Sequence, residues 1–217
     1  MQALEIILNP IIWLMELILR FYESITSSIG IAILLLSVTF SLFLLPLQKS
    51  GRRIEQRVSN KMKAANIEVQ ALKGDLKGEK LFLATERIYK NHGYHPIQSI
   101  ALGLSFFVML PVLLSAILLL TGDAILAGKS FLVISDLSKS DKLLGIINLL
   151  PILMLAITLI DAKLRFQDDK KSQHRFFFIA LVLLILVYNL PAGLVLYWTG
   201  SNMVSLILSR KQAKNVI

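Results

Sequence analysis

Long apolar runs separated by short charged segments dominate this chain of 217 residues. A helix needs about 20 apolar residues to cross the hydrocarbon of a bilayer, and five runs approach or exceed that length. They cover about 27–47, 97–120, 143–160, 176–190 and 192–208. The last two would measure only roughly 22 and 25 Å against about 30 Å of hydrocarbon, so they predict local thinning of the bilayer.

Residues 1–26 have a different pattern, in which apolar positions alternate with Glu16, Arg20 and Glu23. This mixture predicts a helix that lies in the membrane interface, with Trp13 as an interfacial anchor. An additional membrane-spanning helix is the alternative. The segment lacks the basic start and small-residue cleavage site of a signal peptide, so we expect it to be retained.

Residues 49–92 show helical periodicity but carry too many charges for lipid. They predict a helical hairpin with its turn at 74–78 and a net charge of about +6, from eleven bases and five acids. A solvated charged face is one interpretation, and attraction to anionic headgroups or to a ribosome is the other. The candidate bases are Arg52, Arg53, Arg57, Lys61 and Lys63.

Composition and charge support a polytopic membrane protein, since 55% of residues are hydrophobic and 17% are charged. The formal charge of +9 does not indicate a nucleic-acid partner, because the bases lie in the segments between apolar runs. Eleven Lys and Arg residues lie in 49–96 and five in 161–175, against three in 122–142 and one in 1–26. The positive-inside rule therefore places the first two segments and the C-terminal tail in the cytoplasm, with the N-terminus outside.

The sequence contains no motif for an enzyme. There is no cysteine, which excludes disulfides and thiolate nucleophiles, and no nucleophile elbow, phosphate loop or zincin motif occurs. His92 and His95 lack neighbouring ligand residues in the sequence, so they predict turn or interface positions rather than a metal site. We expect no catalytic residue, no cofactor and no metal.

Polar residues inside the apolar runs are the most informative about function, because an unsatisfied polar group in hydrocarbon costs several kcal/mol. For each serine, a hydrogen bond to its own helix is the alternative to a partner elsewhere. The Asn202 amide cannot be satisfied within its own helix, so it should contact another helix or a wet cavity. The predicted groove or interhelix polar residues are Ser37, Ser41, Asn189, Ser201, Asn202 and Ser205.

The segment 191–198, with sequence PAGLVLYW, breaks the last apolar region into two arms. Together with the Ser-Asn pair at 201–202, it resembles the final transmembrane hairpin of the YidC family of membrane protein insertases. Tyr197 and Trp198 follow the turn, where we expect interfacial anchors. Residues 109–114, 131–138 and 150–154 are similar to further stretches of the family, so the likeness covers essentially the whole chain.

The resemblance implies an all-α membrane protein with five transmembrane helices, an N-terminal interfacial helix and a cytoplasmic helical hairpin. Its domains would be 1–26, an interfacial amphipathic helix, and 27–217, an insertase-like membrane domain that includes the hairpin at 49–92. The resemblance implies location in the bacterial inner membrane, and the implied partners are newly made membrane proteins and anionic lipids. The Sec channel and the ribosome are further candidate partners, although the tail after Leu208 has only three bases.

The implied activity is that of an insertase or chaperone, which helps polar segments cross the bilayer through a hydrophilic groove and a thinned membrane. Bacterial members usually carry an arginine five residues before a proline in the first span, and counting back from Pro46 gives Ser41. The alternative is therefore an insertase-like subunit that translocates nothing and is dedicated to the assembly of one membrane complex.

Overall fold

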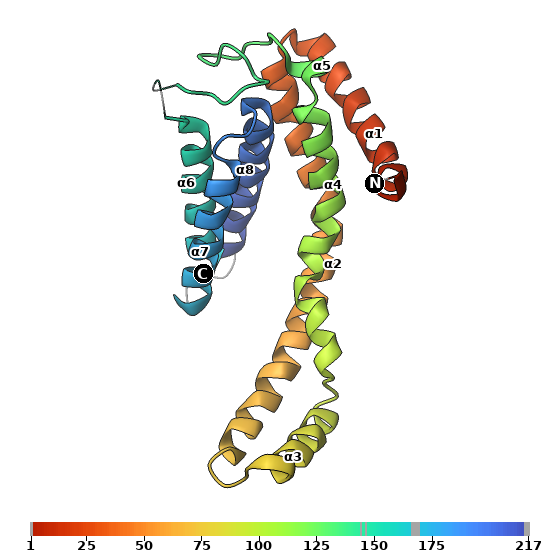
Figure 1. The fold of residues 1–217 in the computed structure, drawn as a ribbon, viewed down its shortest axis with the longest axis vertical. Coiled ribbons are helices and arrows are strands. Elements are labelled where there is room, and N and C mark those ends of the chain that lie inside the picture. Colours follow the sequence, from red (N-terminus) through yellow and green to blue (C-terminus); the bar gives the residue numbers. More distant parts are fainter. Residues whose placement is uncertain (1, 144, 146, 166–169, 215–217) are drawn as a thin grey trace. The chain divides into compact units, whose positions relative to one another are not determined.

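The computed structural model describes residues 2–143, 145, 147–165 and 170–214. These residues form an all-α fold, as the sequence predicted, with an isolated antiparallel bridge between Phe131 and Ile134. The α-helices are α1 (Gln2–Thr26), α2 (Ile29–Leu72), α3 (Gly78–Asn91), α4 (Leu104–Thr121), α5 (Asp123–Leu126), α6 (Leu149–Arg165), α7 (Lys170–Val187) and α8 (Ala192–Lys214) (Figure 1).

Two helices of the described part are long and apolar enough to cross a membrane, namely α2 and the stretch Ala192–Arg210 of α8. Shorter apolar stretches lie at Phe107–Thr121 in α4 and Phe177–Val187 in α7. The helix α1 has the bounds expected for the interfacial segment, and α2 continues from the first apolar run into the basic hairpin. The count of five spans remains a prediction.

In two of the expected spans, the α-helix begins later than predicted. The second begins with a 3-10 helix, η1 (Pro96–Gly103), because His95 caps it: its Nδ1 accepts from the Ile97 N–H, and Gln98 accepts from the His95 N–H. The third begins at Leu149, where the Asp141 carboxylate accepts the N–H groups of Leu149 and Leu150 at 2.7 and 2.9 Å. Side-chain caps of this kind satisfy donors at a helix start and so mark where the helix begins.

The chain divides into two compact units, one made from 1–43 and 111–217 and the other from 44–110. In the first unit, the core collects side chains from α1, α2, α4, α5, α6, α7, α8 and the loop that follows α5. Helix α6 packs against both α7 and α8. The largest fully buried side chains of this core are Met15, Leu19, Ile33, Leu36, Leu120, Leu126, Leu137, Leu194 and Val195.

The second unit contains the basic hairpin, in which the end of α2 pairs with α3. Ala65 and Val69 are buried between the two arms. Polar contacts close the hairpin: Tyr89 Oη donates to Asn66 at 3.1 Å, and His92 Nε2 lies 2.7 Å from Glu68 Oε1. The hairpin is therefore held by specific contacts as well as by its apolar face.

Candidate functional site

Helix α8 approaches α2 closely because two glycines face it. Gly193 and Gly200 are seven residues apart, which places them on the same side of the helix. A Cβ at Gly193 would meet Leu126 at 2.5 Å and the Leu137 carbonyl at 3.3 Å, and a Cβ at Gly200 would overlap the Ser37 hydroxyl. Ser37 is fully buried at this contact, and its hydroxyl donates to the Leu34 carbonyl of its own helix at 2.7 Å.

One turn further along, the two helices exchange a polar contact. The Ser41 hydroxyl donates to the Ser201 hydroxyl at 3.1 Å, across 160 residues of sequence. Both side chains are half-buried. The position at which the YidC family usually carries its arginine therefore holds a hydroxyl that is already paired.

Helix α8 also makes two polar contacts with α6. Asn202 Nδ2 donates to Thr158 Oγ1 at 2.8 Å, and Ser205 Oγ donates to Asp161 Oδ2 at 3.0 Å. Each pair is one helical turn beyond the previous one in both helices, so α6 and α8 run parallel. We call these six residues of α2, α6 and α8 the polar seam: Ser41, Thr158, Asp161, Ser201, Asn202 and Ser205.

Asp161 is a member of the seam that reasoning from the sequence missed. The sequence placed it at a cytoplasmic edge, yet its side chain is buried. The feature of the sequence that could have indicated Asp161 is its three-residue spacing from Thr158, which matches the spacing from Asn202 to Ser205. That match indicates two facing polar pairs only once the two helices are known to be neighbours.

The start of α8 is held by the loop that follows α5. The Ala192 N–H donates to the Lys139 carbonyl at 2.7 Å and the Gly193 N–H to the Leu137 carbonyl at 2.9 Å. These bonds satisfy donors that a helix start would otherwise leave free. The predicted residue Asn189 lies just before this point and is exposed in the turn between α7 and α8.

Asp136 fixes the shape of that loop. Its Oδ1 accepts from both the Ser138 hydroxyl and the Ser138 N–H, at 2.7 and 3.0 Å, and Lys139 Nζ lies 3.2 Å from Oδ2. The two hydrogen bonds from Ser138, with a smaller contribution from Lys139, lower the pKa of Asp136 from 3.8 to about 2. The loop thus holds a carboxylate that is ionised at neutral pH.

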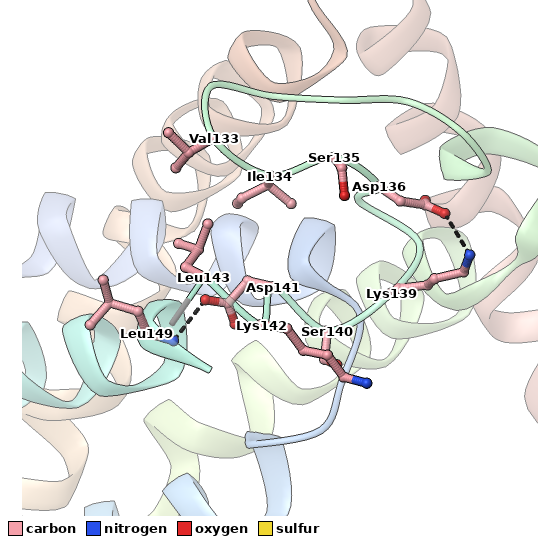
Figure 2. A pocket seen from close by; sticks show the side chains of 10 residues that line it. All are labelled: Val133, Ile134, Ser135, Asp136, Lys139, Ser140, Asp141, Lys142, Leu143 and Leu149. Carbon is pink, nitrogen blue, oxygen red and sulfur yellow. Dashed lines mark hydrogen bonds and ion pairs between the residues drawn. The ribbon is translucent and has the colours of Figure 1, made fainter. Parts of the chain in front are cut away.

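The same loop lines a pocket of about 830 Å³ (Figure 2). Figure 2 shows Val133 and Ile134 on one part of its wall, with the Asp136–Lys139 ion pair and the Asp141 cap of α6 on others. The wall is therefore partly apolar and partly charged. The polar seam is not part of this pocket.

The predicted interfacial anchors differ from one another. Trp13 is 65% exposed on α1, and Trp198 packs partly buried against the core. We expected Tyr197 to be an interfacial anchor, and this was wrong. Its side chain is only 4% exposed and belongs to the core. Its position in α8 directs it at neighbouring helices, which the local sequence does not reveal.

The predicted bases of the hairpin lie on its surface. Arg53, Arg57, Lys61 and Lys63 are exposed, and Lys61 Nζ donates to the Gly93 carbonyl at 3.2 Å. The side chain of Arg52 lies outside the described part of the structure. The surface of this unit can therefore attract anionic groups without burying charge.

Comparison with known proteins identifies the family. The family model of the 60Kd inner membrane protein matches residues 21–215. A protein of Herminiimonas arsenicoxydans named membrane protein insertase YidC is 30% identical over 215 residues, which cover 94% of this chain and 36% of the relative. A protein of the same name from Treponema denticola is 27% identical, covering 92% of this chain and 37% of the relative.

A solved structure shows the same fold. The crystal structure of an active YidC insertase with its first transmembrane domain resolved matches 94% of this chain and 45% of that chain, with a TM-score of 0.58 and 19% identity. The chain spans little more than a third of the length of the two relatives named above. By its match over most of its length, this chain belongs to the 60Kd inner membrane protein family, as its resemblance to YidC sequences predicted.

Proposed function

We propose that this chain is a membrane protein insertase, which helps polar segments of newly made membrane proteins cross the bilayer. The polar seam carries the proposal, because it brings hydroxyl, amide and carboxylate groups of α2, α6 and α8 together between apolar helices. The names of the relatives support it, since both relatives are membrane protein insertases.

The contacts of the seam are weak enough to exchange partners. A hydrogen bond between membrane helices contributes about 0.6 kcal/mol on average, whereas a charged residue at the bilayer centre costs about 2.5 to 3.5 kcal/mol on insertion scales. Ser41, Ser201 and Asn202 are half-buried and so can turn from their present hydrogen-bond partners to a passing polar segment. Such an exchange lowers the barrier to crossing without ATP, a cofactor or covalent chemistry.

A short helix next to the seam adds membrane thinning. The apolar stretch Phe177–Val187 of α7 has eleven residues and would span only about 17 Å of the roughly 30 Å of hydrocarbon. A bilayer adapts to a short apolar stretch by thinning locally or by drawing flanking polar groups inward. We propose that thinning beside α7 and the polar groups of α8 act together on the same substrate.

The proposed membrane position has the N-terminus outside and the C-terminus in the cytoplasm of a bacterial inner membrane. The parallel direction of α6 and α8 supports alternate crossings, because both helices begin at the same end of the first unit. The exposed bases of the hairpin would then face the cytoplasm and anionic headgroups. The Sec channel and the ribosome are candidate partners on that side.

Helix α1 fits the proposed position at the outer membrane interface. Met15 and Leu19 face the core, whereas Trp13 and Leu17 are exposed on another side. A charged strip lies between these two apolar sides, where Glu16 and Arg20 form an ion pair at 2.7 Å. A helix with one side on protein, one on lipid and one on water suits an interfacial location.

A second candidate function is supported by the pairing of Ser41. Because its hydroxyl already contacts Ser201 at 3.1 Å, this face could be a permanent helix contact in a subunit that is dedicated to one membrane complex. Depletion of the protein and proteomics of the membrane fraction separate the two functions. Loss of many small membrane proteins supports an insertase, and loss of one complex supports the dedicated subunit.

The sharper test is insertion of a single-span substrate with an acidic translocated segment into proteoliposomes that contain the purified chain. We expect the wild type to be active, and Ser41→Arg to be tolerated, because an arginine that reaches water avoids the cost it would meet in lipid or in a packed contact. Leu42→Arg is the matched control, since Leu42 is an exposed apolar neighbour on α2 and an arginine there would face lipid. A folded wild type without any insertion activity would contradict the insertase.

A further inference from the structure

A tight turn in the loop after α5 projects two apolar side chains away from the protein. Phe131 and Ile134 exchange two backbone hydrogen bonds of 2.9 Å, and both are anchored inward: the Phe131 ring rests on Gly30 of α2, and Ile134 is buried. Between them, Leu132 and Val133 are 86% and 78% exposed. We call these two residues the outer tip.

Folding of this chain does not explain leucine at the outer tip. Leu132 has φ of 50°, in the left-handed region where glycine or asparagine is favoured at such turns. A branched side chain is strained there, and at 86% exposure it makes little packing contact in return. An apolar side chain where the backbone conformation disfavours it, and where it packs against little of the protein, indicates that it contacts something outside the chain.

The surroundings of the outer tip indicate a lipid surface rather than a protein partner. Two side chains are far too small for a stable protein interface, which needs about 800 Å² from each partner. Lys129, Lys139 and Lys142 lie in the same loop and are exposed, although Lys129 and Lys139 also pair with Glu23 and Asp136. Long basic side chains of this kind can reach anionic headgroups beside inserted apolar residues.

The outer tip is also tied to the helix that we place at the membrane interface. Lys129 Nζ forms an ion pair with Glu23 of α1 at 3.0 Å, so the loop and α1 are held together within the first unit. Val133 of the outer tip also lines the pocket, whose wall passes from Val133 and Ile134 to charged groups (Figure 2). This change from apolar to charged matches the gradient of polarity across a membrane interface.

We propose that Leu132 and Val133 insert into the outer leaflet and set the depth of the loop that caps α8. The inference rests on the proposed membrane position, with this loop outside. Because the carbonyls of Leu137 and Lys139 accept the first N–H groups of α8, the depth of the outer tip determines where α8 begins in the bilayer. The outer tip is thus a second anchor, alongside α1, for the helix that carries the polar seam.

The absence of cysteine from the chain allows a direct test with single cysteines. Leu132→Cys, Val133→Cys and the control Ser135→Cys, all at exposed positions, are labelled with an environment-sensitive fluorophore in proteoliposomes. We expect blue-shifted emission and quenching by spin-labelled lipid at positions 132 and 133, and quenching by aqueous iodide at 135. Equal iodide quenching at all three positions would overturn the proposal. Protection of positions 132 and 133 from iodide that disappears when the protein is diluted in lipid would also overturn it, because a second copy of the chain would then be what covers them.

A second variant separates anchoring from strain. Leu132→Asn should fold at least as well as the wild type, since asparagine suits the left-handed turn, yet it should shift a fluorophore at position 133 toward red, aqueous emission. An unchanged emission in the folded variant would also contradict membrane insertion of the outer tip. Neither fluorescence measurement reports substrate insertion, so the proposal for the outer tip and the proposed insertase function can be contradicted independently.

Discussion

The two arms of the terminal hairpin, α7 and α8, are both apolar but occupy opposite environments. Ile185 and Leu186 of α7 are 71% and 67% exposed, whereas Leu194 and Val195 of α8 are almost completely buried. Both helices contact α6, but α8 also carries glycines against α2 and the polar seam. The buried helix α8 therefore differs from the exposed helix α7 in its small and polar residues, because both helices are apolar.

The physical reason lies in the solvent. Lipid tails are as apolar as leucine, so the hydrophobic effect does not drive one membrane helix against another. Close backbone approach at small residues and hydrogen bonds between helices supply the attraction instead. The same rule applies within α7, where one of the buried residues is the small Ala180.

The largest effect is expected from filling the closest contact of α8. Gly200→Leu would force a side chain into the Ser37 hydroxyl and Leu34, and overpacking of this kind costs about 1 to 3 kcal/mol or more. We expect a clear loss of folded protein in size-exclusion chromatography and a lower thermal midpoint in detergent. Ile185→Ala on the exposed side of α7 is the control and should change little; equal losses in both variants would remove the distinction between the arms.

A smaller loss is expected when the small buried contact at Ala180 of α7 is filled. Ala180→Phe should push α7 away from its neighbour, with a destabilisation of about 1 to 3 kcal/mol because the helix can shift toward lipid. The control Leu181→Phe, at an exposed position, should be neutral. A smaller fall in the thermal midpoint for Ala180→Phe than for Gly200→Leu would show that α7 tolerates an added side chain better than α8 does.

The seam itself should contribute more to function than to stability. Asn202→Leu removes a hydrogen bond worth about 0.6 kcal/mol, and Thr158 keeps its bond of 2.8 Å to the Met154 carbonyl, so no buried hydroxyl is left alone. We expect a nearly unchanged thermal midpoint together with reduced substrate insertion in proteoliposomes. Full insertion activity would show that Asn202 only joins two helices.

The smallest effect concerns the loop that caps α8 and not α7. Because the pKa of Asp136 is lowered from 3.8 to about 2 in the folded protein, its ionised form stabilises the loop above pH 3.8, and that stabilisation is lost as the pH falls toward 2. The thermal midpoint of wild type should exceed that of Asp136→Asn slightly at pH 6, with the difference shrinking below pH 4. A difference that grows on acidification would contradict this assignment.

Much of the fold was predictable because its signals are local. Apolar run length gave the all-α class, helical periodicity gave the hairpin, and the mixed pattern of residues 1–26 gave the bounds of α1. The starts of α4 and α6 were not predicted, because the sequence is already apolar through 97–103 and 143–148. Residues 96–103 form the 3-10 helix η1 instead of α-helix, and the Asp141 cap marks the start of α6 at Leu149.

The candidate site was predictable only in part. The sequence by itself determined that the Asn202 amide needs a partner, since a helix interior offers it none. Only the tertiary structure decided that the partner is Thr158, that Asp161 joins Ser205, and that Tyr197 is buried. Those contacts join residues 44 positions apart or more, and their choice depends on which glycine lets two helices approach, a property of packed surfaces that no local pattern contains.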